Sequence, residues 1–147
     1  MRNKLACILA LLALAPAAGH SKDGIHRGPN AGGRTYAQNY KDMVLAECIA
    51  TAYKNDEKAP VDAGSSVSAL RDWTIYDLDK APYAIRSLID SYLARDYYNP
   101  LAESEIKGIK FDLLKCLDMY HSQELEKQVK QLVIHPRRTY RQDNPPR

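Results

Sequence analysis

The feature that most constrains the fold of this chain is the helical spacing of apolar residues between positions 85 and 122. Apolar side chains three and four residues apart line one face of an α-helix and indicate that this face packs on a core. In the first half of the stretch these residues are Ile85, Leu88, Ile89, Tyr92 and Leu93. In the second half they are Ile106, Ile109, Leu113, Leu117 and Tyr120. The stretch therefore predicts two amphipathic helices.

A polar joint that carries a proline, residues 97–104, separates these two helices. Pro100 lacks a backbone N–H and disfavours the α conformation at Asn99, so we expect the first helix to end there. Ser104 is able to cap the second helix, with Glu105 favourably placed in its first turn.

Three further helices are predicted from the same periodicity and from capping residues. They span about residues 35–53, 62–76 and 123–134. Asp62 and Ser122 are suitable N-cap residues for the second and third of them. No stretch shows the sustained alternation of apolar and polar residues that marks a half-buried strand. The sequence predicts an all-α fold, a small bundle of about five helices in one domain.

The first 19 residues have the composition of a cleavable signal peptide. Arg2 and Lys4 precede an uncharged apolar run at 5–14, and small residues at 15–19 offer a cleavage site. The run is too short to span a bilayer, and no second run of spanning length follows it. We therefore expect the mature protein outside the cytoplasm, with no membrane association after cleavage.

Composition divides the remaining chain into three parts. Residues 20–34 are rich in glycine and lack periodicity, so we expect a flexible leader. Residues 35–134 contain the predicted helices and form the folded domain. Residues 135–147 are basic and proline-rich, and we expect a disordered tail.

Removal of the signal peptide leaves two cysteines, Cys48 and Cys116. An even number of cysteines in an oxidising compartment suggests one disulfide, which would join the first and fourth predicted helices. Two buried free thiols are the alternative.

Charge is distributed unevenly along the chain. The full chain carries a net charge of +3, whereas residues 35–134 contain 12 Lys and Arg against 16 Asp and Glu. The tail from residue 135 adds four arginines against one acidic residue. An acidic body is poorly suited to nucleic acid and better suited to a basic protein partner. An ordinary solvated surface with a solubilising tail is the alternative.

The sequence lacks the H-E-x-x-H, C-x-x-C and G-x-S-x-G motifs and a phosphate-binding glycine loop. Cys116 and His121 are five residues apart on one predicted helix and therefore lie on different faces, which disfavours a nucleophile–base pair. We expect no catalytic residues, no metal and no cofactor. A small secreted enzyme that uses Cys48 or Cys116 as a nucleophile is an alternative.

The joint offers a candidate binding surface. Arg95, Tyr97, Tyr98 and Asn99 gather charged, aromatic and amide groups at one helix end. Tyrosine is enriched at protein interfaces because it gives a large contact area for little loss of side-chain entropy. The alternative is that Tyr97 packs inward and that only Tyr98 is exposed.

Three blocks of the sequence resemble the immunity proteins of type VI secretion amidase effectors, in particular the subgroup that inhibits the fourth amidase effector family. The blocks are SSVSALRDWTIYD at 65–77, IDSYLARDYYNPL at 89–101 and KFDLLKCLDMYHSQEL at 110–125. The resemblance covers residues 36–140, and it rests on the order of the blocks because no short motif defines the family.

The resemblance implies a periplasmic, all-helical homodimer that forms a heterotetramer with two toxin molecules. The toxin is similar to NlpC/P60 cysteine peptidases and cleaves the peptide of peptidoglycan. A protruding loop enters its catalytic cleft, and a helix of the other subunit contributes. Placed on this chain, the loop is residues 98–103, which adds Leu101 and Glu103 to the candidate contacts, and the helix is residues 84–97. An exported helical chaperone or adaptor for another protein client is the alternative function.

Overall fold

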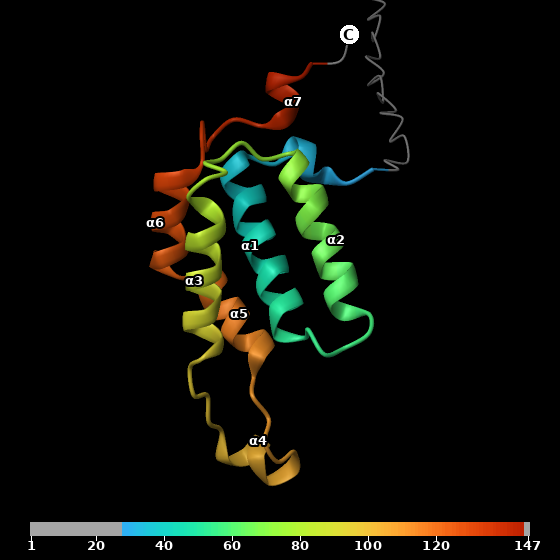
Figure 1. Cartoon of the computed structure of the whole chain (residues 1–147), viewed down its shortest axis with the longest axis vertical. Helices are drawn as coiled ribbons and strands as arrows, with labels where there is room; N and C mark the ends of the chain where they lie inside the picture. The colour runs from blue at the N-terminus through green and yellow to red at the C-terminus, as the bar shows by residue number, and fades with distance from the viewer. Residues whose placement is uncertain (1–27, 146–147) are drawn as a thin grey trace, which may run out of the picture.

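The computed structural model describes residues 28–145, so the predicted signal peptide and most of the predicted leader lie outside the described residues. Within 28–145 the chain forms one short 3-10 helix and seven α-helices and no strand (Figure 1). The elements are η1 (Asn30–Gly33), α1 (Tyr36–Ala52), α2 (Ala59–Asp72), α3 (Ala81–Leu93), α4 (Pro100–Glu105), α5 (Asp112–Tyr120), α6 (Gln123–Leu132) and α7 (Tyr140–Asp143). The prediction of an all-α bundle is confirmed.

Helix α1 is the centre of the bundle, since it contacts α2, α3, α5 and α6. Its start agrees with the prediction, because Thr35 and Gln38 form a capping box in which each side chain bonds the backbone of the other. Its buried residues come from more than one face, as a helix with several neighbours requires. They are Tyr36, Asn39, Tyr40, Met43, Val44 and Cys48.

Helix α2 begins earlier than predicted and also ends earlier. The expectation that Asp62 caps it is wrong, because the helix starts at Ala59 with Pro60 in its first turn. Proline is tolerated there, since the N–H that it lacks has no intrahelical acceptor. Asp56 takes the capping role: its carboxylate accepts hydrogen bonds from the backbone N–H groups of Lys58 and Ala59, both at 2.8 Å.

Helices α3 and α6 bury the faces that their periodicity predicts. Five residues of α3 are buried, namely Ala81, Ile85, Leu88, Ile89 and Tyr92. Ser122 caps α6 as expected, accepting a hydrogen bond from the N–H of Leu125 at 3.1 Å. Gln128 of α6 donates a hydrogen bond to the carbonyl of Ala84 at 2.8 Å and so ties α6 to α3.

The helix predicted from Ser104 to Tyr120 is wrong in its first half. Pro100 opens the separate helix α4, whose N-cap is Asn99 and not Ser104. The helix then stops at Glu105, and the backbone takes left-handed angles at Gly108 (φ 73°) and Phe111 (φ 53°) before α5 begins. Glycine adopts such angles without steric cost, so Gly108 is a natural point for the chain to leave the helix.

The inward face predicted for this region is also wrong. Helix α5 buries Lys115, Cys116 and Met119, whereas Leu113 and Leu117 are exposed. Ile106, expected on the same inward face, is exposed in the segment between α4 and α5. The cause is the bond at Cys116, which turns its own side of α5 toward α1.

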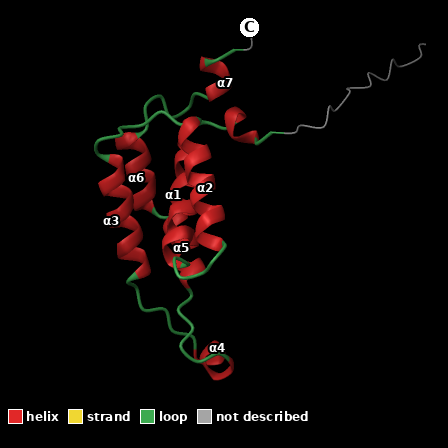
Figure 2. Ribbon diagram, turned by 45° about the vertical axis from the view of Figure 1, so that its right-hand side comes forward, coloured by secondary structure: helices red, strands yellow, loops and turns green. Residues whose placement is uncertain are grey.

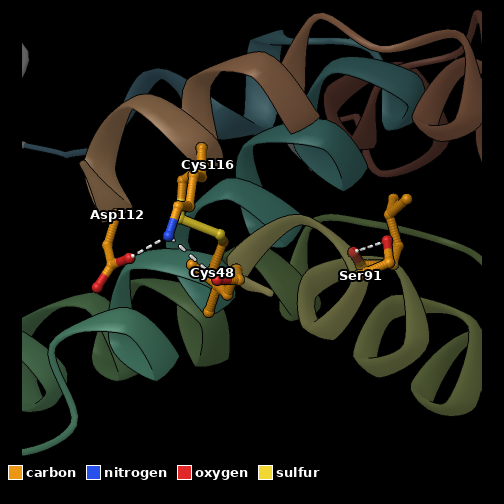
Figure 3. Close-up of a disulfide and its surroundings, with 7 residues drawn as sticks. Cys48, Ser91, Asp112 and Cys116 are labelled. Atoms are coloured by element: carbon orange, nitrogen blue, oxygen red, sulfur yellow. Dashed lines mark hydrogen bonds and ion pairs between the residues drawn. A yellow bond between two sulfur atoms is a disulfide. The ribbon is translucent and has the colours of Figure 1, made fainter. Parts of the chain in front are cut away.

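The predicted disulfide is confirmed. Cys48 of α1 and Cys116 of α5 are bonded, with 5.7 Å between their Cα atoms and 68 residues between them in sequence (Figure 3). Both cysteines are fully buried. The expectation of two free thiols is therefore excluded.

The two ends of the described chain are joined to each other. Tyr36 donates from its backbone N–H to the carbonyl of Arg138 at 2.8 Å, and from its hydroxyl to the carboxylate of Asp143 at 2.6 Å. Thr139 caps α7 with a capping box of its own. Residues 135–145, expected to be a disordered tail, are therefore ordered, because their polar groups find partners at the start of α1.

The last part of the predicted leader is ordered as well. Ala31 and Gly32 of η1 are buried. The buried side chain of Asn39 donates to the carbonyl of Ala31 at 2.9 Å and to that of Trp73 at 3.0 Å. One amide thus links η1 and the end of α2 to α1, which the composition of residues 28–34 did not indicate.

Reduction of the disulfide is expected to lower the free energy of unfolding by about 4 kcal/mol, the chain-entropy value for a loop of this length. The measurement is urea unfolding followed by circular dichroism, with and without dithiothreitol. The double variant Cys48→Ala/Cys116→Ala is the control, because reductant should not move its midpoint. A wild-type midpoint that is the same in both conditions would contradict the expectation.

The ion pair and hydrogen bonds at Asp143 predict an acid-sensitive contact between the chain ends. Bonds from the Tyr36 hydroxyl and the Arg138 guanidinium lower the pKa of Asp143. A carboxylate with a lowered folded-state pKa adds stability above its unfolded pKa of about 3.9, and this stability disappears as the pH falls through the folded-state pKa. Asp143→Asn should therefore lower the urea midpoint at pH 7, and its difference from wild type should shrink progressively as the pH falls below about 3.9. Equal midpoints at pH 7 would show that the contact does not stabilise the fold.

Candidate protein-binding site

Residues 94–111 form a loop that projects from one end of the bundle, with α4 at its tip (Figure 1). We refer to these residues as the projecting loop. A second view shows the same arrangement, with α4 at the end opposite α7 (Figure 2). Helix α4 buries no residue, and no substantial helix-to-helix contact in residues 28–145 involves it. The loop is therefore the part of the described chain that is most free to enter a cavity of another molecule.

Large apolar side chains are exposed on the projecting loop. Tyr98 is 72% exposed and Leu101 is 80% exposed, and Ile106, the residue directly after α4, is also exposed. Of the two adjacent tyrosines, Tyr98 points to solvent and Tyr97 is half-buried. The alternative in which Tyr97 packs inward is therefore the one observed, and Tyr98 and Leu101 are the residues that offer apolar contact area.

Two of the predicted contact residues bond within the tip instead. Asn99 accepts hydrogen bonds from the N–H groups of Leu101 at 3.0 Å and Ala102 at 3.3 Å. Glu103 accepts one from the N–H of Gly108 at 2.9 Å. These bonds close α4 and the turn after it into one unit, so Asn99 and Glu103 shape the tip from within.

The remaining two predicted residues point back toward the bundle. The Tyr97 hydroxyl donates to the carboxylate of Asp118 in α5, and this hydrogen bond raises the pKa of Tyr97. The Arg95 guanidinium lies 3.4 Å from the centre of the Tyr92 ring, a cation–π contact at the end of α3. Arg95 and Tyr97 therefore belong to the base of the loop and not to its tip.

A second apolar surface lies beside the base of the loop. We refer to the exposed side of α5, formed by Phe111, Leu113, Leu114 and Leu117, as the outer face of α5. A shallow hollow of about 220 Å³ connects it to the loop and is lined by Tyr97, Tyr98, Asn99, Phe111 and Leu114. Sequence reasoning missed this face because it assigned Leu113 and Leu117 to the core. The three-residue spacing of Cys116 and Met119 was the signal that could have indicated which side of α5 faces the core.

Neither a free cysteine nor a metal-binding group of side chains lies among residues 28–145. Cys48 and Cys116 are bonded to each other, so the alternative of an enzyme with one of them as nucleophile is wrong. Across residues 28–145, no three His, Cys, Asp or Glu side chains are grouped so that they would hold a metal ion. Among the helices of this part of the chain, none combines the length and apolar character needed to cross a bilayer.

Two solved structures share this fold. One comes from work on new type VI-secreted toxins and self-resistance proteins in Serratia marcescens; it is 27% identical, has a TM-score of 0.69, and the match covers 94% of this chain and 98% of the other. The other is the Tae4/Tai4 effector–immunity system from Salmonella typhimurium, with 21% identity, a TM-score of 0.61 and coverage of 71% and 96%. At 21% identity this second similarity shows the fold alone. A comparison with curated proteins found no match.

A protein-family comparison gives a more specific result. The family described as Tai4, type VI secretion system amidase immunity protein, matches residues 38–129, which include α2 to α5 and the projecting loop. Because this match spans more than half of the 147 residues, the chain belongs to the Tai4 family of type VI secretion system amidase immunity proteins.

Proposed function

We propose that this protein acts in the periplasm, where it binds a cognate peptidoglycan amidase and blocks the active site of that enzyme with its projecting loop. Membership of the family supports immunity against an amidase effector. The observation that carries the proposal is the loop itself, a closed tip with Tyr98 and Leu101 exposed at the end of the bundle.

The tip has the physical properties of an inhibitory element. Its internal hydrogen bonds, which the side chains of Asn99 and Glu103 accept, order α4 before any partner arrives. The loop then loses little conformational entropy on binding, so more of the contact free energy appears as affinity. Exposed aromatic and apolar side chains on such an element are the usual anchors of a protein interface.

The partner follows from the resemblance described above: an enzyme similar to NlpC/P60 cysteine peptidases that cleaves the peptide of peptidoglycan. Its substrate lies outside the cytoplasm, so an inhibitor must be exported to meet it, and residues 1–19 have the composition of a cleavable signal peptide. The net negative charge of residues 35–134 would speed encounter with a basic enzyme. No catalytic step by this chain is required.

The proposal includes a homodimer that holds two amidase molecules. The outer face of α5 supports it, because Leu113, Leu114 and Leu117 are all exposed there, although Leu113 and Leu117 were expected in the core. Apolar side chains gathered on a surface in this way are characteristic of protein contacts. Since this face adjoins the base of the projecting loop, a second copy bound there would place its own helices near the first copy's loop.

An exported chaperone or adaptor is the second candidate, and the same outer face of α5 is the observation that favours it. Such a protein would bind client segments there and leave the amidase active. Mixing the purified chain with the cognate amidase separates the two functions, because only the immunity protein stops peptidoglycan hydrolysis.

The variant Tyr98→Ala/Leu101→Ala is expected to weaken binding to the amidase by a factor of about 30 or more, because each residue is an exposed anchor on the loop and loss of an anchor costs about 2 kcal/mol. Isothermal titration calorimetry and inhibition of peptidoglycan hydrolysis measure the effect. Asn99 is left unchanged, since its loss would also remove the cap of α4.

The matched control is Leu78→Ala/Tyr83→Ala. Tyr83 is 81% exposed in the first turn of α3 and Leu78 is 65% exposed just before it, at the end of the bundle opposite α4 (Figure 1). This control should bind as wild type does. An equal loss of affinity in both double variants, or no loss in either, would contradict the proposal that the projecting loop contacts the amidase.

The variant Leu113→Glu/Leu117→Glu is expected to convert the dimer to a monomer, because it places charges in an interface that has to be desolvated. Multi-angle light scattering at micromolar concentration gives the mass. A wild-type protein that is already monomeric, or a variant that remains dimeric, would contradict the assignment of the dimer contact to the outer face of α5.

A further inference from the structure

The direction of the projecting loop is decided where it joins the bundle, because α4 at its tip has no substantial packing partner in the described residues. Two non-helical segments, 94–99 and 106–111, connect α4 to α3 and α5. Segments of this kind permit many orientations of the tip unless side chains at their base restrict them. The direction of the tip therefore depends on the residues at the base of the loop.

Lys115 is the most unusual of these residues, since it is only 5% exposed and is the one buried charged side chain among residues 28–145. Its ammonium group donates to the backbone carbonyl of Leu93 at 3.2 Å and to the carboxylate of Asp112 at 3.0 Å. Leu93 is the last residue of α3 and Asp112 the first of α5. One side chain thus joins the two helix ends between which the projecting loop runs.

Both partners of Lys115 suit a positive charge. The last carbonyls of a helix lack intrahelical donors and carry the negative end of the helix dipole. Asp112 adds a carboxylate on the other side, and Figure 3 shows it beside the Cys48–Cys116 disulfide. An apolar side chain would fill this space without the desolvation penalty of a buried ammonium. The buried charge therefore indicates that Lys115 does more than fill the core. Its hydrogen bonds to Leu93 and Asp112 indicate that it holds together the helix ends on either side of the loop.

Tyr97 makes a second connection across the same place. Its hydroxyl donates to Asp118 of α5, and its ring centre lies 5.9 Å from the Lys115 ammonium group. Tyr97 lies in the first connecting segment of the loop, whereas Lys115 and Asp118 lie in α5. We refer to the bonds of Lys115 and Tyr97 as the neck contacts.

The neck contacts involve helix α5, which is fixed to the rest of the bundle. Cys116, next to Lys115 in sequence, is bonded to Cys48 in the central helix α1. Helix α5 is therefore held against the bundle by a covalent bond. Because Tyr97 bonds Asp118 of this helix, the first segment of the loop is held in place as well.

We propose that Lys115 and Tyr97 are positioning residues that hold the projecting loop in the direction in which it enters the amidase. Neither side chain touches the enzyme. Without them the loop samples several directions, and only a fraction of molecules presents the tip correctly. The apparent dissociation constant rises as that fraction falls. This inference rests on the proposed function, because it assumes that the loop is the inhibitory element.

The test measures association and dissociation rates of the full mature chain with the cognate amidase by surface plasmon resonance. Lys115→Met and Tyr97→Phe should each lower the association rate by about tenfold, since a tenth of the molecules would then be competent, and should leave the dissociation rate within about twofold. A residue that contacts the enzyme behaves in the opposite way, because loss of a contact acts mainly on dissociation. Tyr98→Ala serves as that comparison.

Lys130→Met and Tyr83→Phe are the matched controls, as they remove the same groups from exposed positions outside the loop. A second measurement needs no partner: hydrogen exchange of the backbone amides of residues 94 and 95, which are bonded at the end of α3, should become faster in Lys115→Met and Tyr97→Phe, and not in the controls. Tyr97→Phe removes one hydroxyl, so it keeps the test available if Lys115→Met does not fold.

Wild-type association rates in both neck variants, or a loss of affinity carried by dissociation, would overturn the inference. Unchanged hydrogen exchange at residues 94 and 95 would overturn it as well. If the wild-type chain itself failed to bind the amidase, the proposed function would fall, and hydrogen exchange would still decide whether the neck contacts hold the loop.

Discussion

The covalent bond between α1 and α5 is the constraint on which the rest of the structure depends. Helix α1 is surrounded by four other helices, and Cys48 lies on it in full burial. Cys116 must reach that position, so α5 is rotated until Cys116, Lys115 and Met119 face inward. The leucines that would otherwise form its core face turn outward as a consequence. A single bond thus sets both the packing of the fourth large helix and the character of its exposed side.

The orientation of α5 also positions the side chains that hold the base of the projecting loop. With Lys115 facing inward, its ammonium group reaches the end of α3, and with Asp118 near the loop, the Tyr97 hydroxyl finds an acceptor. The loop between α3 and α5 is then held at its base, while its tip is closed by Asn99 and Glu103. A preformed projection of this kind suits a protein that acts by filling another protein's groove. Reactive groups would add nothing to that action.

Much of this could be predicted from the sequence, and the errors have a common cause. The periodicity of residues 35–53 and 85–93 and the cap at Ser122 identified α1, α3 and α6, because each element is specified by its own residues. The joint at residues 97–104 was recognised as a candidate surface, and the structure shows that Tyr98 and Leu101 are exposed there. The roles of Tyr97 and Glu103 could not be foreseen, since their partners lie in α5 and in a turn that the periodicity concealed. Asn99 and Arg95 interact with near neighbours instead, and an asparagine directly before a proline is itself the signal of a helix N-cap.

What the sequence alone determined is the all-α class, the helices α1, α2, α3 and α6 to within a few residues, the joint after α3 and the candidate pairing of Cys48 with Cys116. These depend on local spacing, on capping residues and on the number of cysteines. Only the tertiary structure decided which side of α5 faces the core and whether the chain ends are ordered. A nine-residue helix with apolar residues on two sides fits a core in either orientation, and a distant bond makes the choice. The chain ends, likewise, are ordered by hydrogen bonds to residues about 100 positions away, which no local pattern reveals.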